Sequence, residues 1–327
     1  MPYRIVFMGT HQFAIPTLQT LMDWSAPEEG HGQVVGVVTQ PDRPRGRGQQ
    51  PQPSPVKRLA QQYGMPVLEP TSLRDAQVLT ELRGWQPELI VVAAFGQILP
   101  ATLLELARYG CLNVHASLLP RWRGAAPVAA AILAGDAITG VTIMKMDAGL
   151  DTGPILRQRS LAIAPDDTCD SLTQQLAHLG AELLRDTLPG WLTGALEPQP
   201  QDERLATLAP QLKKEQGQVN WNASAEHIAR QVRAFHPWPG AFTYWQGQPL
   251  KILRAVADIE YPTASHDQAV SGGGRLPGTV LSTPEGLAVV AGRGVLYLQE
   301  VQPAGRRPMP AQAFARGTRG LVGARLV

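Results

Sequence analysis

The stretch LIVVAAF, residues 89–95, indicates the fold because it is apolar throughout and shows no polar alternation. Strands with this pattern are buried on both faces, as the strands of parallel sheets are. Similar stretches rich in branched apolar residues occur on either side of it: RIVFMG (4–9), VVGVVTQ (34–40) and CLNVHAS (111–117). We therefore predict a buried strand at each of the four stretches.

Helical patterns separate these strands. We expect helices over residues 16–24, 54–63, 73–84, 100–108, 125–134 and 170–188, and a further strand over GVTIMKMD, residues 140–147. Ser54 is suited to cap the second helix, with Pro55 in its first turn. The alternation of strand and helix predicts an α/β fold with a doubly wound, mostly parallel sheet, whose ligands bind at the carboxyl ends of the strands.

The pattern changes near residue 195. Residues 196–217 contain three prolines and no sustained period, which is typical of a linker. After it we expect one helix at 224–235 and short strands at 241–245, 250–256, 278–282, 286–291 and 295–301, with a turn at the glycines 272–274. Short strands at this spacing predict a small β-barrel, OB-like, or a sandwich. We thus expect domains at 1–195 and 218–327, joined by the linker 196–217.

Composition excludes several classes of protein. The 327 residues are 44% hydrophobic and 17% charged, which suffices for two cores and differs from a disordered chain. The longest apolar runs span about seven residues, whereas a membrane span needs roughly 20. The N-terminus shows no export signal, and two cysteines, Cys111 and Cys169, are too few for a disulfide framework or a thiolate metal cage. We expect a cytoplasmic protein with no membrane contact.

The two parts of the chain differ in charge. Residues 1–203 carry 15 Lys and Arg against 20 Asp and Glu, and residues 204–327 carry 14 against 7, so the net charges are −5 and +7. A basic second part joined to an acidic first part is expected if the second part holds a polyanion. The alternative is a solvated basic surface with no partner.

The segment CLNVHASLLPRWRGAAP, residues 111–127, carries candidate chemistry. Asn113 and His115 are two apart on a predicted strand, so their side chains leave the same face. Burying an amide and an imidazole costs free energy unless both are hydrogen-bonded. Their position near the ligand-binding edge of the sheet therefore indicates a functional role. The SLLP turn that follows is expected to leave backbone groups free for a flat polar ligand. A core histidine bonded to a backbone carbonyl is the alternative.

A second segment, MDAGLDTGPIL at 146–156, places Asp151 between Gly149 and Gly153, where the backbone can take conformations closed to other residues. An Asp in such a loop is often only a turn former. With Asn113 and His115, however, it completes the parts that acyl transfer needs. These are a donor for a developing oxyanion, a ring that handles a proton, and an acid that orients the ring.

These segments resemble the folate-dependent formyltransferases, whose signature is N-x-H followed by SLLP and a later Asp in a Gly-flanked loop. Within that superfamily the chain is similar from end to end to the members that formylate methionyl-tRNA. The matching segments include RIVFMGT, VVTQPDRPRGRGQ at 37–49, VVAAFGQILP at 91–100 and APQLKKEQGQVNW in the expected linker. The sequence departs from the family pattern at His11, Gln12 and Gln211.

The resemblance implies a formyltransferase-like Rossmann-type first domain and a reaction. The α-amino group of methionine on initiator tRNA would attack the formyl carbon of 10-formyltetrahydrofolate directly, through a tetrahedral intermediate. Asn113 and His115 would stabilise the oxyanion, and Asp151 would help to remove the proton from the nitrogen. The folate site would comprise Ser117, Leu118, Leu119 and Pro120.

No covalent enzyme intermediate and no metal is expected in this reaction. The glycines at 46, 48 and 272–274 match neither dinucleotide nor Walker phosphate-loop patterns, so no nucleotide cofactor is implied.

Basic residues in three places are candidate tRNA contacts. Arg43, Arg45 and Arg47 alternate in the Pro/Gly-rich loop 41–55, which we expect to be mobile when free. The resemblance implies that this loop meets the acceptor arm of tRNA, with Arg45 as the best single candidate. The other candidates are Lys213 and Lys214 in the linker, and Arg306, Arg307, Arg316 and Arg319 near the C-terminus.

The second domain would then be the tRNA-binding one. Trp221 and Trp238 are expected to be packed corners of that domain rather than base-stacking platforms. We expect a monomer.

Two other functions stay open. The chain could formylate a small amine, such as glycinamide ribonucleotide or an amino sugar nucleotide, but the basic second part makes little sense for a small acceptor. It could instead be a tRNA-binding protein with an inactive formyltransferase-like domain. The intact set of Asn113, His115 and Asp151 argues against that second alternative.

Overall fold

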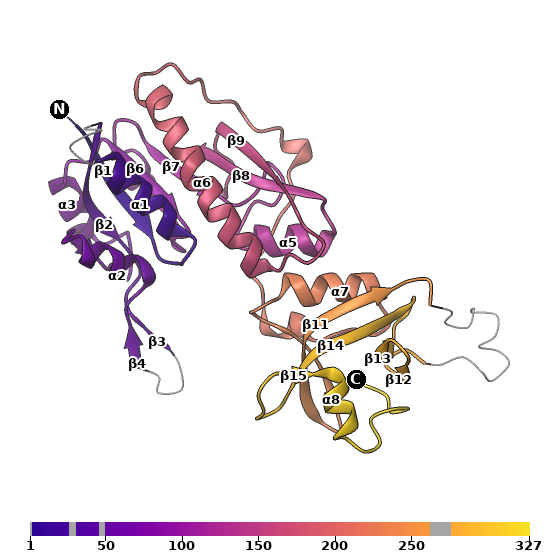
Figure 1. The fold of residues 1–327 in the computed structure, drawn as a ribbon. Helices are drawn as coiled ribbons and strands as arrows, with labels where there is room; N and C mark the ends of the chain where they lie inside the picture. Colours follow the sequence, from indigo (N-terminus) through magenta and orange to yellow (C-terminus); the bar gives the residue numbers. More distant parts are fainter. Residues whose placement is uncertain (1, 26–30, 46–49, 262–275) are drawn as a thin grey trace. The chain divides into compact units, whose positions relative to one another are not determined.

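A computed structural model describes residues 2–25, 31–45, 50–261 and 276–327 (Figure 1). Arg47 and the glycines at 272–274 lie outside these ranges. The chain divides into two compact units. The first comprises Met1–Pro127, Ile138–Ala162 and Leu172–Pro210, and the second comprises Val128–Ala137, Ile163–Ser171 and Gln211–Val327.

A seven-stranded sheet forms the centre of the first unit, in the order β5-β2-β1-β6-β7-β8-β9. Its strands are β1 (Tyr3–Gly9), β2 (Gly32–Val38), β5 (Val67–Leu68), β6 (Leu89–Ala93), β7 (Cys111–His115), β8 (Ile138–Lys145) and β9 (Ile155–Ala162). Neighbours from β5 to β7 pair in parallel, whereas β8 and β9 pair antiparallel. The prediction of a doubly wound, mostly parallel α/β sheet is confirmed.

Strand β9 was not expected from the sequence. It reads ILRQRSLA and lies at the edge of the sheet, with most of its side chains at least partly exposed. An edge strand needs one buried face at most, so the long apolar run that marks a central strand is missing.

The helices of the first unit largely follow the predicted positions. They are α1 (Ala14–Trp24), α2 (Pro55–Gln62), α3 (Ala76–Gly84), α4 (Ala101–Leu104) and α6 (Cys169–Leu192), the last of which starts in the second unit. Ser54 caps α2 as expected, because its hydroxyl accepts a hydrogen bond from the Lys57 amide. Helix α4 is shorter than the stretch 100–108, while α6 is longer than 170–188.

Packing between α6 and β7 determines which face of β7 carries the candidate catalytic side chains. Leu112 and Val114 are buried, and a Cβ placed on Gly180 of α6 would lie 2.6 Å from Val114 Cγ1. Only glycine allows so close an approach. Because side chains alternate along a strand, Asn113 and His115 therefore project from the opposite face of β7.

The second unit is built on an antiparallel sheet in the order β10-β11-β14-β13-β12, with β15 also paired to β14. Its strands are β10 (Ala241–Trp245), β11 (Gln248–Asp258), β12 (Val280–Thr283), β13 (Gly286–Val290), β14 (Val295–Pro303) and β15 (Met309–Pro310). Its helices are α5 (Pro127–Ala134, from its second residue), α7 (Ala225–Ala234) and α8 (Ala311–Arg316). Neither β15 nor α8 was expected.

The last residues of the chain connect the two ends of this sheet. Val280 in β12 donates to the Ala324 carbonyl and accepts from the Gly323 amide, while Tyr244 in β10 exchanges two hydrogen bonds with Val327. Residues 323–327 thus close the sheet into a small barrel, in agreement with the OB-like prediction.

The two tryptophans expected at packed corners differ. Trp221 is buried and donates from Nε1 to Thr243 Oγ1 at 3.0 Å, as expected. For Trp238 the expectation is wrong, because its side chain is 54% exposed. The turn that holds it is closed by a hydrogen bond from the Gly240 amide to the Phe235 carbonyl, and Phe235 takes the buried position instead.

None of the described helices is long and apolar enough to cross a membrane.

Candidate active site

The carboxylate of Asp151 brings the three predicted catalytic residues together. Its Oδ1 atom lies 3.4 Å from Asn113 Nδ2, and its Oδ2 atom lies 3.6 Å from His115 Nδ1. Oδ2 also accepts a hydrogen bond of 2.9 Å from the Gly124 amide. The side chains of His115 and Asp151 are 6% and 14% exposed, so the pair is screened from most solvent. An amide, an imidazole and a carboxylate therefore meet on one face of β7.

The Asp151 loop reaches the imidazole by an unexpected route. Strand β8 runs antiparallel to β7, so the loop that follows it starts at the amino end of β7, where the Met146 amide donates to the Cys111 carbonyl. His115 is the last residue of β7. The loop must therefore run back over the face of the strand to place Asp151 beside the ring. The site lies partly over this face rather than wholly beyond the carboxyl ends of the strands.

Both nitrogens of the His115 ring face oxygen acceptors. Nε2 lies 3.0 Å from the Trp122 carbonyl oxygen, and Nδ1 faces the Asp151 carboxylate. A carbonyl can only accept, so Nε2 carries the proton in that contact. When the ring is doubly protonated, it can keep this hydrogen bond and form an ion pair with the Asp151 carboxylate, 3.6 Å from Nδ1. This arrangement agrees with a proton-handling role more closely than with a histidine bonded only to a carbonyl.

Asp147, rather than Asp151, makes the turn in the Gly-flanked loop. Its Oδ1 accepts from the Gly149 amide at 3.0 Å and from the Thr152 hydroxyl at 2.6 Å. Asp151 itself adopts the left-handed conformation, with φ at 52°. Neither glycine has a positive φ; a Cβ at Gly149 or Gly153 would instead collide with neighbouring atoms. The expectation of special backbone angles at the glycines is wrong, because they serve close packing.

The SLLP turn, Ser117–Pro120, does not leave its backbone groups free as expected. Thr142 Oγ1 donates to the Ser117 carbonyl and accepts from the Leu119 amide, and Gln158 Nε2 donates to the Leu119 carbonyl. The Leu118 and Pro120 carbonyls are bonded to other backbone amides. All four carbonyls of the turn are therefore hydrogen-bonded, two by polar side chains on β8 and β9 and two by backbone amides. The role of these four residues in folate binding stays a prediction.

Residues outside the predicted set hold this site in place. Arg123 is 4% exposed and bonds to Gln201 and Glu203, and Gln201 in turn donates to the carbonyls of Asp151 and Gly153. The sequence carried a weak signal for Arg123, which sits in the turn directly after SLLP. It carried none for Gln201, which is in the stretch expected to be a linker.

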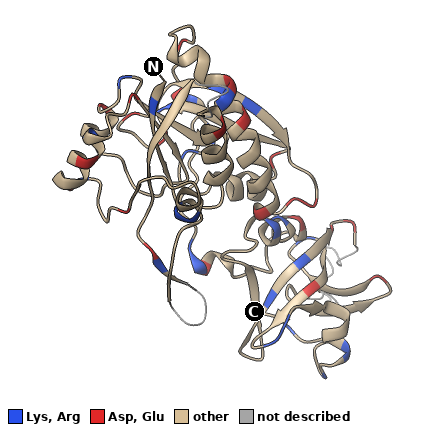
Figure 2. Ribbon diagram, turned by 60° about the vertical axis from the view of Figure 1, so that its left-hand side comes forward, with Lys and Arg blue, Asp and Glu red and all other residues tan. Residues whose placement is uncertain are grey.

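The candidate tRNA contacts belong to both units. Arg43 and Arg45 lie in β3 (Arg43–Arg45), which pairs with β4 (Gln50–Gln52) in the first unit. Arg43 is exposed. The loop expected to be mobile is thus a β-hairpin over its described residues. The remaining candidates, all exposed and all in the second unit, are Lys213, Lys214, Arg306, Arg307, Arg316 and Arg319. Figure 2 shows Lys and Arg positions in blue along the ribbon.

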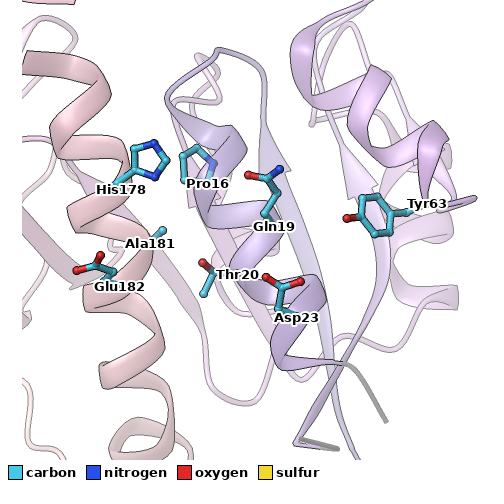
Figure 3. Close-up of a pocket in the computed structure, with 8 residues that line it drawn as sticks. All are labelled: Pro16, Gln19, Thr20, Asp23, Tyr63, His178, Ala181 and Glu182. Carbon is cyan, nitrogen blue, oxygen red and sulfur yellow. The ribbon is translucent and has the colours of Figure 1, made fainter. Parts of the chain in front are cut away.

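A polar pocket of about 380 Å³ lies elsewhere in the first unit, between α1 and α6 (Figure 3). Its lining includes Asp23, Tyr63, His178 and Glu182. None of the three predicted catalytic residues lines it, so we place the site at Asp151 instead. Across the residues that the structure describes, no group of three or more His, Cys, Asp or Glu side chains could hold a metal ion.

Comparison with known proteins assigns the chain to a family. The sequence model named "Formyl transferase" matches residues 3–188, and that of the "Formyl transferase, C-terminal domain" matches residues 211–319. The chain belongs to the formyl transferase family.

Its relatives are similar over their full length. The methionyl-tRNA formyltransferase of Trichlorobacter lovleyi is 48% identical, over 96% of this formyl transferase and 94% of the relative. That of Roseiflexus castenholzii is 47% identical over 100% and 99%. Among solved structures, HypX from Aquifex aeolicus in complex with tetrahydrofolic acid shares the fold, with a TM-score of 0.62 at 18% identity over 99% of this chain and 49% of that chain.

Proposed function

We propose that this formyl transferase moves the formyl group of 10-formyltetrahydrofolate to the α-amino group of methionyl-initiator-tRNA, giving N-formylmethionyl-tRNA for translation initiation. The observation that carries the proposal is the Asp151 carboxylate held against both Asn113 and His115. The relatives named methionyl-tRNA formyltransferase, matched over nearly the whole chain, support the choice of acceptor.

The donor set suits a formyl oxygen that gains negative charge. As the amine adds to the formyl carbon, the Asn113 amide and the His115 Nε2–H would donate to that oxygen. In this structure Nε2–H faces the Trp122 carbonyl, so the formyl oxygen would replace that carbonyl as the acceptor. Asp151, whose Oδ2 faces Nδ1, would stabilise the imidazolium and help to take the proton from the attacking nitrogen. Collapse of the tetrahedral intermediate would then break the bond between the formyl carbon and the folate nitrogen N10, and tetrahydrofolate would leave as N10 takes up a proton.

The parts of the chain would share this work. We propose that residues 1–195 bind the folate, with Ser117–Pro120 beside the reacting centre, and that residues 218–327 bind tRNA through a basic surface. Arg43, Arg45, Lys213 and Lys214 would contact phosphates. We propose a monomeric, cytoplasmic enzyme with no need for a metal.

One assay tests the proposal. Purified protein is incubated with 10-formyltetrahydrofolate and methionyl-tRNA, with glycinamide ribonucleotide as a parallel acceptor, and formyl transfer is measured. We expect N-formylmethionyl-tRNA and no formylated ribonucleotide. Transfer only to glycinamide ribonucleotide would show that the acceptor is a small amine rather than methionyl-tRNA. Transfer to neither acceptor would favour a tRNA-binding protein without formyltransferase activity.

A further inference from the structure

We propose that Gln201 is a positioning residue for the formyl transfer reaction, acting through Asp151. It lies in residues 199–209, here called the strap, which runs along the first unit next to the site. The inference rests on the proposed function, because it concerns the same carboxylate.

Gln201 holds the backbone on which Asp151 sits. Its Nε2 group donates to the Asp151 carbonyl at 2.8 Å and to the Gly153 carbonyl at 2.7 Å. Asp151 has φ at 52°, a conformation that side-chain-bearing residues rarely adopt and that surrounding contacts must maintain. The side-chain NH₂ group of Gln201 thus donates both of its hydrogen bonds to the loop that carries the Asp151 carboxylate.

Arg123 fixes which way the Gln201 amide points. The Arg123 guanidinium donates from Nε and Nη2 to Gln201 Oε1, at 3.0 and 2.8 Å. A guanidinium can only donate and a carbonyl can only accept, so a reversed amide would leave both sides unsatisfied. Glutamine alone among residues of this size offers an acceptor on one atom and two donors on the other. The chemistry of the position therefore demands glutamine rather than glutamate.

The rest of the guanidinium is tied back to the strap. Arg123 Nη1 and Nη2 each lie 2.8 Å from an oxygen of Glu203, a paired contact of the kind that fixes geometry as well as charge. The hydrogen bond from Arg123 holds the pKa of Glu203 below its ordinary value, so this carboxylate is ionised at neutral pH. The carboxylate of Glu203 thus neutralises the positive charge of the buried Arg123 guanidinium. Gln201 lies between that guanidinium and the Asp151 loop.

The strap also holds the opposite side of the site. Thr207 accepts from the Trp122 amide at its hydroxyl and from the Arg123 amide at its carbonyl, both at 2.9 Å. This fixes the turn that presents the Gly124 amide to Asp151 and the Trp122 carbonyl to His115. Residues on either side of the imidazole–carboxylate pair are thus held by one segment.

A change at Gln201 should therefore alter the reaction rate more than substrate binding. If the Asp151 loop shifts, the carboxylate loses its position against His115 and the attacking nitrogen, whereas the surfaces proposed to bind folate and tRNA stay in place. A misplacement of a catalytic group by about 1 Å can cost roughly a hundredfold in rate. We expect kcat to fall and the KM values for both substrates to stay nearly constant.

The test compares Gln201→Glu with Gln199→Glu. Glutamate at 201 keeps the acceptor for Arg123 but cannot donate to the two carbonyls. Gln199 lies on the same strap with an exposed side chain, so its variant adds the same charge without touching the loop. Relative to wild type, we expect kcat to fall by roughly tenfold to a hundredfold in Gln201→Glu and to change little in Gln199→Glu. Equal kcat values would overturn the inference.

A second arm separates a positioning role from a general loss of stability. In a protein that already carries Asp151→Asn, adding Gln201→Glu should lower kcat by less than a further twofold. The effects of two residues that act as one unit on kcat are not additive. A full additional loss in that background would show that Gln201 does not act through Asp151. The NMR chemical shifts of the His115 ring, measured at one fixed pH, should also change in Gln201→Glu and stay unchanged in Gln199→Glu, because the Asp151 carboxylate lies beside the ring.

The NMR measurement needs no turnover, so it tests the inference even if the wild-type protein fails to formylate methionyl-tRNA. Absence of wild-type transfer would contradict the proposed function alone, whereas unchanged chemical shifts of the His115 ring in Gln201→Glu would contradict the positioning role alone. Should Gln201→Glu not fold, Gln201→Met, of similar size and uncharged, replaces it in both measurements.

Discussion

At the scale of single residues, Asp151 decides what the site can do. A carboxylate in a Gly-flanked loop is commonly a turn former. Here Asp147 forms the turn, which leaves the Asp151 oxygens for Asn113, His115 and the Gly124 amide. A left-handed backbone at Asp151 is the local cost of this arrangement. That cost points to a residue kept for chemistry rather than for local structure.

Loss of either proposed oxyanion donor should slow the reaction. We expect Asn113→Ala and His115→Ala to lower kcat by roughly a hundredfold or more, the usual effect of removing such a donor. Steady-state formyl transfer to methionyl-tRNA measures the change. His178→Ala, in the polar pocket away from the site, serves as the control. Near-normal turnover in Asn113→Ala or His115→Ala would remove that residue from the mechanism.

The two cysteine side chains should differ in reactivity. Burial raises the pKa of the Cys111 thiol from 9.0 to about 12, whereas Cys169 is partly exposed. The thiolate is the reactive form, so iodoacetamide at pH 8 should modify Cys169 and spare Cys111 until the protein unfolds. Peptide mass mapping after a timed reaction measures both. Equal modification of the two in the native protein would contradict the burial of Cys111.

The same pKa shift makes stability depend on pH. Below pH 9.0 the thiol is protonated in both states; between 9.0 and about 12 only the folded state keeps its proton. The unfolded chain then binds fewer protons, so the free energy of unfolding should fall as the pH rises through that window.

At the scale of elements, the hairpin of β3 and β4 is anchored at its base. Thr39 Oγ1 and Ser54 Oγ, which flank the hairpin in sequence, lie 2.8 Å apart and are buried. Lys57 Nζ lies 2.9 Å from both Asp42, the residue before β3, and Glu69. A lysine held by two carboxylates fixes the direction in which this short hairpin projects from the rest of the first unit. Arg43 follows directly after this anchor.

Loss of the anchor should weaken binding of tRNA but not of folate. We expect Lys57→Met to raise the KM for methionyl-tRNA several-fold, because the hairpin that presents Arg43 is released, while the KM for 10-formyltetrahydrofolate stays unchanged. Arg58→Met is the matched control, since Arg58 is exposed and carries the same charge one residue further on. An equal effect of the two substitutions would mean that the charge matters and the anchor does not.

The anchor should hold at every pH used for activity. Hydrogen bonds to Glu69 and Asp42 raise the pKa of Lys57 above its ordinary value of 10.5. A base with a raised pKa contributes its stabilisation in full below the ordinary value and loses it as the pH rises through the shifted one. The difference in tRNA binding between wild type and Lys57→Met should therefore be flat from neutral to mildly alkaline pH.

At the scale of the whole molecule, charge is divided along the chain. The first 203 residues carry a net −5 and the remainder +7, and the exposed basic residues of the barrel belong to the second part. Phosphate contacts release counterions, so affinity for tRNA should fall with salt in proportion to the number of contacts. A basic surface without a partner would show no such coupling to tRNA.

Neutralising basic residues of the second unit should flatten that salt dependence. We expect Lys213→Gln with Lys214→Gln to weaken tRNA binding and to reduce the slope of log K against log salt, by roughly 0.7 to 0.9 per lost phosphate contact. Arg74→Gln with Arg83→Gln, exposed in the first unit, removes equal charge as the control. An unchanged slope in the lysine variant would favour the solvated-surface alternative.

The sequence by itself determined the elements that form a buried or capped pattern. Apolar runs such as 89–95 and the Ser54 cap carry their signal locally, because a buried strand must be apolar and a helix start must satisfy its amides. The candidates Asn113, His115 and Asp151 were also visible, as residue types in a family signature. What the sequence could not contain was the distance between them.

Only the tertiary structure decided how those residues meet. The antiparallel direction of β8 sends the Asp151 loop back over β7, and the edge strand β9 completes the sheet without an apolar signature. The sequence of the strap that holds the loop predicts a linker. The strap is held by hydrogen bonds of polar side chains such as Gln201, and these produce no periodic apolar pattern in the sequence. Contacts between residues some fifty positions apart depend on where the chain folds, and no local propensity records them.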